Sequence, residues 1–280
     1  MENMDLLIET LYKHNSHEMD KNIEFEEESH KYTIKIDPDT KYTSVTTWVH
    51  SHFEKFDSDK IIKKMMEGKN WKEGHKYWGM TPEEIKNSWS SNGNSVASLG
   101  TNLHYNIECF MNNPNLEKGY KHSDILNYYI ENAVKEDEKR SKEWQYFINY
   151  IVDHPHLKPY RTEWTVYNID NKIAGSIDMV YENDDGSLSI YDWKRCQNIS
   201  PINNFNKYSI NPVISEMPDS NFWHYALQLN MYKNILETKY GKKVKELKLV
   251  RLHPTSDNYE LIDLPDLSEE INKLLGLGVK

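Results

Sequence analysis

The spacing of apolar and polar positions changes near Arg161 and divides the chain into two regions. Before Arg161, apolar residues recur mostly at helical intervals, whereas after it they alternate or form the short runs typical of strands. The first region predicts helices over residues 4–14, 44–56, 57–67, 98–111, 123–134 and 141–152, a helix start at 81–84, and strand-like patches within 22–36. We expect a turn at residues 90–94, between the helix that starts at Thr81 and the helix over 98–111.

The second region predicts strands followed by one long helix. Strands are expected over residues 163–168, 172–182, 187–194, 244–252 and 259–264, and helices over 222–240 and 267–275, with a polar loop at 198–220. This order indicates an α/β fold, with a mixed central sheet flanked by helices and an N-terminal helical annex. We expect residues 1–97 to form the N-terminal hairpin and annex and residues 98–280 to form the core, joined as one continuous structural unit.

The sequence Asp-Asp-Gly at 184–186 predicts a tight turn between two core strands. With the turn centred on its middle residue, Asp178 lies opposite Asp192, where Cβ atoms are about 4.5–5.5 Å apart and like charges destabilise a sheet. A divalent cation would turn that repulsion into ligation, and Mg²⁺ and Mn²⁺ prefer such oxygen ligands. Lys194 shares a face with Asp192, so its ammonium group can orient water or stabilise negative charge. The ordinary alternative is a surface hairpin with scattered charges.

Three further groups of polar residues flank the hairpin. His104 and Glu108 are four residues apart on a helix, so the imidazole could bind a metal and the carboxylate could orient it. Gln228 and Tyr232 have the same spacing on a later helix and could bond to a phosphate or to the lysine. Glu163 offers a third carboxylate. The ordinary alternatives are a polar helix face, a core tyrosine with a glutamine at its rim, and a solvent-facing acid.

Lysines and aromatic residues gather in the annex. The lysines could contact phosphates, and the rings could stack on the bases of a single strand, although a solvated basic face and a packed annex are the commoner explanations. The residues are Lys60, Lys63, Lys64, Lys69 and Lys72, with Trp71, Tyr77, Trp78 and Trp89.

Four short motifs follow one another along the chain: Gly100-Thr-x-x-His104-x-x-x-Glu108, Gly175-x-x-Asp178, Asp192-x-Lys194 and Gln228-x-x-x-Tyr232. In this order they resemble the RecB-like branch of the PD-(D/E)XK nuclease superfamily. That branch includes the RecB nuclease domain, the CRISPR adaptation exonucleases, mitochondrial genome maintenance exonuclease and, more distantly, lambda exonuclease. Ser44-Val45-Thr46 is similar to the entry segment of many phage and viral relatives, so the resemblance covers roughly residues 42–254.

The resemblance implies a PD-(D/E)XK (restriction-endonuclease-like) core that hydrolyses phosphodiester bonds with one or two Mg²⁺ or Mn²⁺ ions. It favours a DNA exonuclease that acts on single strands or DNA ends. The implied metal ligands are His104, Asp178, Asp192 and the backbone carbonyl of Trp193. The implied catalytic residues are Asp178, Asp192, Lys194, Glu108, Gln228 and Tyr232. Expected nucleic-acid contacts are Thr101, Ser44, Thr46, Lys194, Arg195, Gln228 and Tyr232.

Composition adds few constraints. The formal net charge of -10 counts mildly against a protein that coats nucleic acid, but a local cleft can still be basic. The only cysteines, Cys109 and Cys196, are too few for the iron–sulfur cluster of some relatives, so no such cluster is expected. No stretch is apolar enough for a membrane span, and the N-terminus does not resemble a signal peptide. We expect a soluble intracellular protein, in the cytoplasm, the nucleus or a virus-infected host cell, with nucleic acid as its partner.

Two other functions fit the same residues. An RNA endonuclease of the cap-snatching type also uses a histidine, two acids and a lysine, although the Gln228 and Tyr232 motif favours the RecB-like interpretation. A catalytically silent nucleic-acid or protein-binding module on the same fold would show no metal-dependent cleavage. Replication, recombination, DNA repair and genome packaging are all compatible with a nuclease of this kind.

Overall fold

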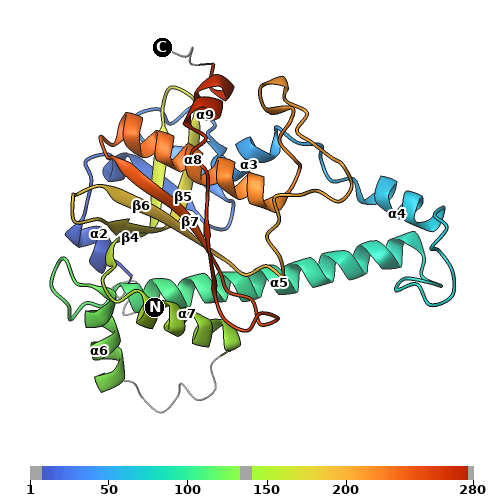
Figure 1. Cartoon of the computed structure of the whole chain (residues 1–280). Helices are drawn as coiled ribbons and strands as arrows, with labels where there is room; N and C mark the ends of the chain where they lie inside the picture. Colours follow the sequence, from blue (N-terminus) through green and yellow to red (C-terminus); the bar gives the residue numbers. More distant parts are fainter. Residues whose placement is uncertain (1–7, 133–140, 277–280) are drawn as a thin grey trace.

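The computed structural model describes residues 8–132 and 141–276 and contains a mixed six-stranded sheet with helices on both faces (Figure 1). The strand order is β3-β5-β6-β7-β8, and β4 also pairs with β5. β3 runs parallel to β5, β6 runs parallel to β7, and the other neighbours are antiparallel. The strands are β3 (Thr43–Ser44), β4 (Lys158–Asn168), β5 (Ile173–Glu182), β6 (Leu188–Lys194), β7 (Val244–Arg251) and β8 (Glu260–Asp263), with a separate hairpin of β1 (Ile23–Glu26) and β2 (Lys31–Ile34).

Two hydrophobic cores lie on the two faces of the sheet. Leu188 and Ile190 of β6 join the first core with residues of α3, α8 and α9, whereas Tyr191 and Trp193 join the second core with residues of α5, α6 and α7. Side chains of β6 therefore alternate between the cores, as the period of a strand predicts. The helices are α2 (Thr10–His14), α3 (Val45–His50), α4 (Ser58–Met66), α5 (Pro82–Met111), α6 (His122–Asn132), α7 (Lys142–Asp153), α8 (Asn221–Lys239) and α9 (Ser268–Leu274), with 3-10 turns at Asp20–Asn22 and Pro212–Ile214.

The α/β fold expected from the sequence is confirmed, and most element boundaries shift by a few residues. The helix expected over residues 44–56 ends at His50. Ile36 lies beyond the end of β2 and is 59% exposed, so it does not extend the strand. Of the helix expected over residues 4–14, the segment Thr10–His14 forms α2, and residues 1–7 lie outside the described residues. No helix in the described part of the chain combines the length and hydrophobicity that a membrane span requires.

The turn expected at residues 90–94 is wrong, because α5 runs unbroken from Pro82 to Met111. Serine, asparagine and glycine disfavour a helix interior by up to about 1 kcal/mol each. Both ends of α5 are fixed, however: Thr81 forms a capping box with Glu84, and the last turns are buried in the second core. Helix growth from anchored ends overcomes weak local propensity. The division expected between residues 97 and 98 therefore falls inside one helix.

Two strands share one edge of β5 and leave a gap in the pairing between them. β4 pairs with one edge of β5 from Ile173 to Glu182, with a break at Asp178. The other edge is shared, because β3 pairs with Ile173 and Ala174 whereas β6 pairs only with Met179 to Glu182. On this edge, residues 175–178 are paired with neither strand. We call this unpaired stretch of β5, together with the end of β6 beside it, the fork.

The register of the β5–β6 hairpin is as predicted. Met179 pairs with Tyr191 and Glu182 with Leu188, so the same register continued toward the fork sets Asp178 against Asp192. At this point the Trp193 backbone N–H donates to Oδ2 of Asp178, at 3.1 Å, instead of to a strand carbonyl. The Asp178 side chain thus replaces the missing backbone partner where β6 leaves β5.

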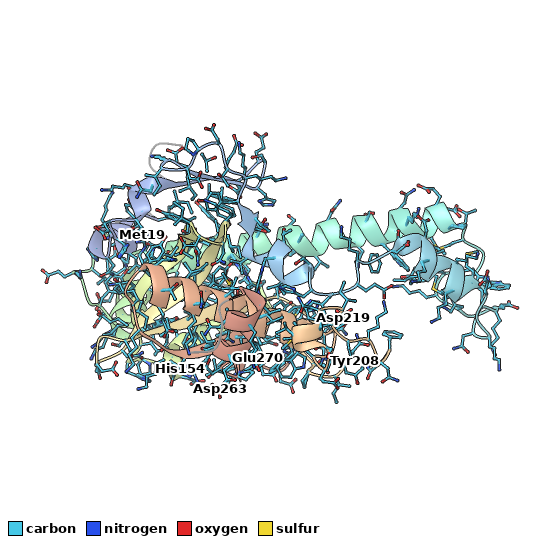
Figure 2. The ribbon with its side chains drawn as sticks, turned by 90° about the horizontal axis from the view of Figure 1, so that it is seen from above. Met19, His154, Tyr208, Asp219, Asp263 and Glu270 are labelled. Atoms are coloured by element: carbon cyan, nitrogen blue, oxygen red, sulfur yellow. The ribbon has the colours of Figure 1, made fainter. Side chains whose placement is uncertain are left out.

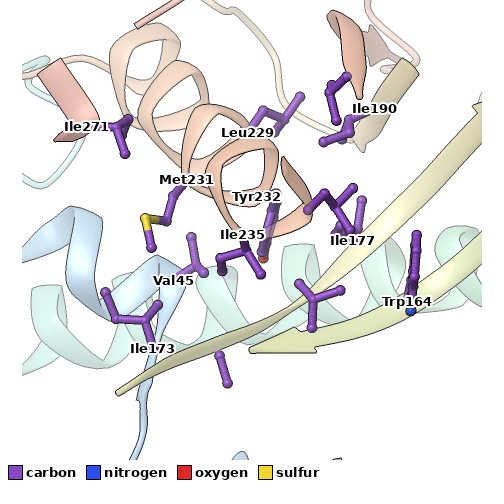
Figure 3. Close-up of a cluster of buried hydrophobic side chains, with 14 of the residues drawn as sticks. Val45, Trp164, Ile173, Ile177, Ile190, Leu229, Met231, Tyr232, Ile235 and Ile271 are labelled. Atoms are coloured by element: carbon purple, nitrogen blue, oxygen red, sulfur yellow. The ribbon is translucent and has the colours of Figure 1, made fainter. Parts of the chain in front are cut away.

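Gly175 lets helix α8 approach β5 closely at the fork. A Cβ atom on Gly175 would lie 2.7 Å from Cε1 and 2.9 Å from the hydroxyl oxygen of Tyr232, and 3.0 Å from Cγ2 of Val45. Figure 3 shows Tyr232 and Ile235 pointing from α8 toward the strands. Real Cβ atoms do not approach backbone or ring atoms this closely, so only glycine fits without displacement of Tyr232.

We predict that Gly175→Ala lowers the free energy of unfolding by about 1–3 kcal/mol, because an extra methyl group overfills a packed core. The measurement is urea unfolding followed by circular dichroism. Gly100→Ala is the matched control: a Cβ there meets nothing within 4 Å, and alanine favours a helix interior by about 1 kcal/mol over glycine. Equal stability of the two variants would contradict the proposed close approach.

Candidate metal centre

Five ionisable side chains from four elements meet at the fork. His104 comes from α5, Glu163 from β4, Asp178 from β5, and Asp192 and Lys194 from β6. The sequence predicted that Asp178, Asp192, Lys194 and His104 lie together, and the structure brings them together. It also places Glu163 among them, which the sequence left open.

The imidazole of His104 is held between a backbone carbonyl and two carboxylates. Its Nε2 lies 2.9 Å from the carbonyl oxygen of Trp193. Its Nδ1 lies 3.4 Å from Oδ2 of Asp178 and 3.8 Å from Oε1 of Glu163. The ligand atoms of His104, Glu163 and Asp178 all lie within 4.8 Å of one another. The Trp193 carbonyl, expected as a direct metal ligand, therefore orients the histidine in this structure.

Glu163 adopts a backbone conformation that an L-residue rarely takes. Its φ is 42°, in the left-handed region, and this costs a non-glycine residue roughly 1–2 kcal/mol. The hydroxyl of Ser176 on β5 donates to Oε2 of Glu163 at 3.0 Å. Such strain persists only where surrounding structure imposes it, and it concentrates at functional sites. The backbone thus turns Glu163 toward His104 at the cost of local strain.

Asp192 and Lys194 form a buried ion pair beside this group. Asp192 is 2% exposed, and Nζ of Lys194 lies 2.5 Å from its Oδ2. The ammonium group also lies 4.6 Å from the centre of the Tyr225 ring, within the range of a cation–π contact. A carboxylate and an aromatic face therefore hold the lysine in place.

Burial and mutual charge shift the pKa of four groups in the cluster, Asp178, Asp192, His104 and Lys194. Burial raises the pKa of Asp178, with His104 opposing and Glu163 adding to the shift. Burial and the charge of Asp178 raise the pKa of Asp192 to about 6, against the effect of Lys194. Burial alone would lower the pKa of His104, but Asp178 and Glu163 raise it to about 9. Burial likewise opposes the charge of Lys194, but Asp192 and Asp178 raise its pKa above the usual value.

These residues fit a divalent cation. Carboxylate oxygens suit Mg²⁺ and Mn²⁺, and a neutral imidazole nitrogen is an ordinary ligand of transition metals. A histidine that binds metal through one nitrogen usually donates its other N–H to a carbonyl or carboxylate. His104 has this arrangement, since Nε2 faces the Trp193 carbonyl and Nδ1 faces the carboxylates. The fit requires His104 to lose the proton that the carboxylates hold on Nδ1.

Three other predicted residues surround the cluster. Glu108 lies one turn from His104 on α5, and burial together with the charge of Glu163 raises its pKa to about 7. Gln228 hydrogen-bonds to Tyr232, which is only 3% exposed and belongs to the first core. Tyr232 is therefore placed to support the fork, with Gln228 nearer the surface.

The residues predicted to contact nucleic acid differ in their exposure and in their hydrogen bonds. Ser44 caps α3, its Oγ accepting from the backbone N–H of Thr47 at 3.1 Å, and Thr46 is exposed. Thr101 is exposed and donates to the carbonyl of Ala97. Arg195 donates to Oε1 of Glu143 at 2.8 Å. The Arg195 side chain also lines a pocket of about 370 Å³ between α5 and α7, and none of the five cluster residues lines this pocket.

Tyr225 is the site residue that sequence reasoning missed. It precedes Gln228 by three residues in α8, so both lie on the same helix face, and its ring meets Lys194. That spacing was a usable signal. The position of Glu163 was less accessible, because no sequence pattern reports a left-handed φ at a glutamate.

We predict that His104 of the metal-free protein titrates near pH 9 instead of the usual 6.5, because a raised pKa keeps the imidazole protonated through neutral pH. NMR of the imidazole resonances, assigned with a His104→Gln variant, measures this. His122 is an internal control, since burial lowers its pKa to about 3 and it should not titrate near neutrality. A His104 midpoint at or below 6.5 would contradict the charge arrangement.

Comparison with known proteins leaves the family open. No protein-family model matches the chain, and no curated protein matches it either. A solved structure titled "Crystal structure of SSO0001" is 16% identical, with 99% of this chain and 84% of that chain covered and a TM-score of 0.32. A likeness at this level carries no argument about function. The chain is accordingly described as a mixed α/β protein with a carboxylate–histidine cluster at the fork of its sheet.

Proposed function

We propose that the chain is a divalent-metal-dependent nuclease with a PD-(D/E)XK-type core. One observation carries the proposal: Asp178 and Asp192 come from neighbouring strands and lie close enough for the charge of Asp178 to raise the pKa of Asp192, and Lys194 pairs with Asp192 at the same point. Two buried carboxylates repel each other, and each is costly to desolvate. An arrangement with this cost is better explained by a bound cation than by a structural role.

The protein groups proposed to hold the ion are Nδ1 of His104 and the carboxylates of Asp178 and Glu163, with Asp192 beside them. When bound, Mg²⁺ or Mn²⁺ supplies Lewis acidity for phosphodiester hydrolysis. Glu163 thus joins the ligand set that the resemblance gave as His104, Asp178, Asp192 and the Trp193 carbonyl. The Trp193 carbonyl fixes the orientation of His104.

Lys194 is proposed to act as a hydrogen-bond donor. The neighbouring carboxylates raise its pKa, so the side chain keeps its proton at neutral pH. A protonated ammonium group can orient an attacking water or stabilise the charge that develops on phosphate oxygens. Tyr225 limits the directions in which Lys194 can point, because its ring lies against the ammonium group.

The proposed substrate is DNA. We propose that the protein cleaves it as an exonuclease, acting on single strands or on DNA ends. This finer assignment rests on the four motifs in their order, which resemble the RecB-like branch. The cluster itself is equally suited to RNA, since a phosphodiester is the same group in both polymers. Cleavage of RNA alone would favour an endonuclease of the cap-snatching type.

We predict that the purified protein degrades DNA with Mg²⁺ or Mn²⁺ and that EDTA stops the reaction. Asp178→Asn and Lys194→Ala should each lower kcat by at least ~100-fold, the usual effect of removing a group that stabilises a transition state. Asp178→Asn keeps an oxygen that can accept from the Trp193 N–H, so the fold should persist. End-labelled and circular DNA and RNA, single- and double-stranded, are the substrates to compare.

Asp184→Asn is the matched control for these variants. Asp184 lies at the turn of the same hairpin with a side chain that is 94% exposed, so its removal should leave cleavage unchanged. Wild-type cleavage by Asp192→Ala would contradict the assignment of the site. Binding of nucleic acid without cleavage under any of these conditions would indicate a catalytically silent module instead.

A further inference from the structure

A small lobe stands apart from the sheet at the far end of α5. It consists of residues 55–89: the segment before α4, α4 itself, the loop that follows and the first turns of α5. Figures 1 and 2 both show α4 and the start of α5 extending away from the rest of the molecule. Ile62 and Ile85 are fully buried and belong to neither of the two cores, so the outer lobe has a small core of its own.

The outer lobe carries positive charge in an acidic protein. Residues 55–89 contain eight lysines and six acidic residues, whereas the whole chain has a formal charge of -10. Several acids nearby already have partners: Asp57 caps α4, Asp59 pairs with Lys86, and Glu84 caps α5. Six exposed lysines of the outer lobe form no ion pair among the described residues; they are Lys55, Lys63, Lys64, Lys69, Lys72 and Lys76. No carboxylate neutralises these ammonium groups, so they can bind an anion such as a phosphate.

Aromatic rings lie among these lysines. Trp89 contacts Phe56 and Tyr77, with ring centres 6.1 and 6.0 Å away, and Trp71 lies 5.8 Å from Trp78. Not all of these rings are buried in the small core, because Phe56 is 73% exposed and Trp78 is 48% exposed. Unneutralised lysines beside exposed rings provide both contacts that a single-stranded nucleic acid makes, through its phosphates and its base faces.

A solvent-exposed stretch of α5 separates the outer lobe from the cluster. Every residue from Ser90 to Leu99 is exposed. At the rise of an α-helix, the fifteen residues from Trp89 to His104 span roughly 22 Å. A stacked strand would cover that distance with about six nucleotides, at a rise of about 3.4 Å each.

We propose that the outer lobe is a second nucleic-acid contact, which binds single-stranded nucleic acid several nucleotides away from the fork. The inference rests on the proposed function for its biological setting, but the contact itself follows from charge, exposed rings and distance. A strand held at both places lies along α5 and is presented to the cluster. Short substrates reach the fork without touching the outer lobe.

The test measures binding without cleavage. Fluorescence anisotropy with labelled oligothymidylate of about 20 nucleotides, longer than a typical single-strand site, is recorded in EDTA. Lys63→Glu with Lys64→Glu, and separately Phe56→Ala with Trp78→Ala, should each weaken binding about tenfold or more. These side chains are exposed, so the variants should fold, and circular dichroism checks this. Lys243→Glu with Lys245→Glu, two exposed lysines at the start of β7, is the matched charge control.

Unchanged affinity of both outer-lobe variants would overturn the inference, whatever the protein cleaves. An equal loss of affinity for duplex DNA of the same length would overturn the assignment to single strands. With metal present, the variants should raise KM for the long oligonucleotide and leave kcat/KM for a trinucleotide unchanged. If wild type binds through the outer lobe but cleaves nothing, the proposed function fails and the second contact stands.

Discussion

The structure depends on the balance of charge between Asp178 and Asp192 where β6 separates from β5. Burial disfavours both carboxylates, and their opposition adds repulsion. Lys194 and a protonated His104 supply the opposing charge from two different elements. Buried ionic groups of this kind contribute little net stability, because desolvation offsets attraction. Their arrangement is therefore explained better by the proposed metal binding than by a contribution to stability.

The surrounding fold serves to keep this cluster in place. β3 and β6 share one edge of β5 and leave residues 175–178 unpaired, which makes room for side chains from α5 and β4. Because Gly175 has no side chain, Tyr232 of α8 packs directly against β5 and fills the first core beside the fork. Tyr225, from the same helix, meets Lys194. α5 then links the fork to the basic, aromatic outer lobe. The helix thus connects the proposed reaction centre with the proposed second nucleic-acid contact.

The sequence predicted the hairpin well because local rules determine it. Asp-Asp-Gly at 184–186 fixes the turn, the turn fixes the register, and the alternation along β6 decides which core each side chain enters. Helix-spaced pairs such as His104 and Glu108 were found for the same reason. Properties set by distant contacts were not accessible. The continuity of α5 depends on anchoring at both ends, the left-handed φ of Glu163 on its neighbours, and the orientation of His104 on the Trp193 carbonyl.

Metal binding at the fork is tested most directly by a crystal of the protein soaked with Mn²⁺ and examined for anomalous scattering. We expect a peak at coordination distance from Nδ1 of His104 and from the carboxylates of Asp178 and Glu163, with Nε2 of His104 still on the Trp193 carbonyl. The Asp178→Asn protein should lose or strongly weaken that peak. A fork without anomalous density at saturating Mn²⁺, or a peak bound only at other carboxylates, would contradict a metal site at the fork.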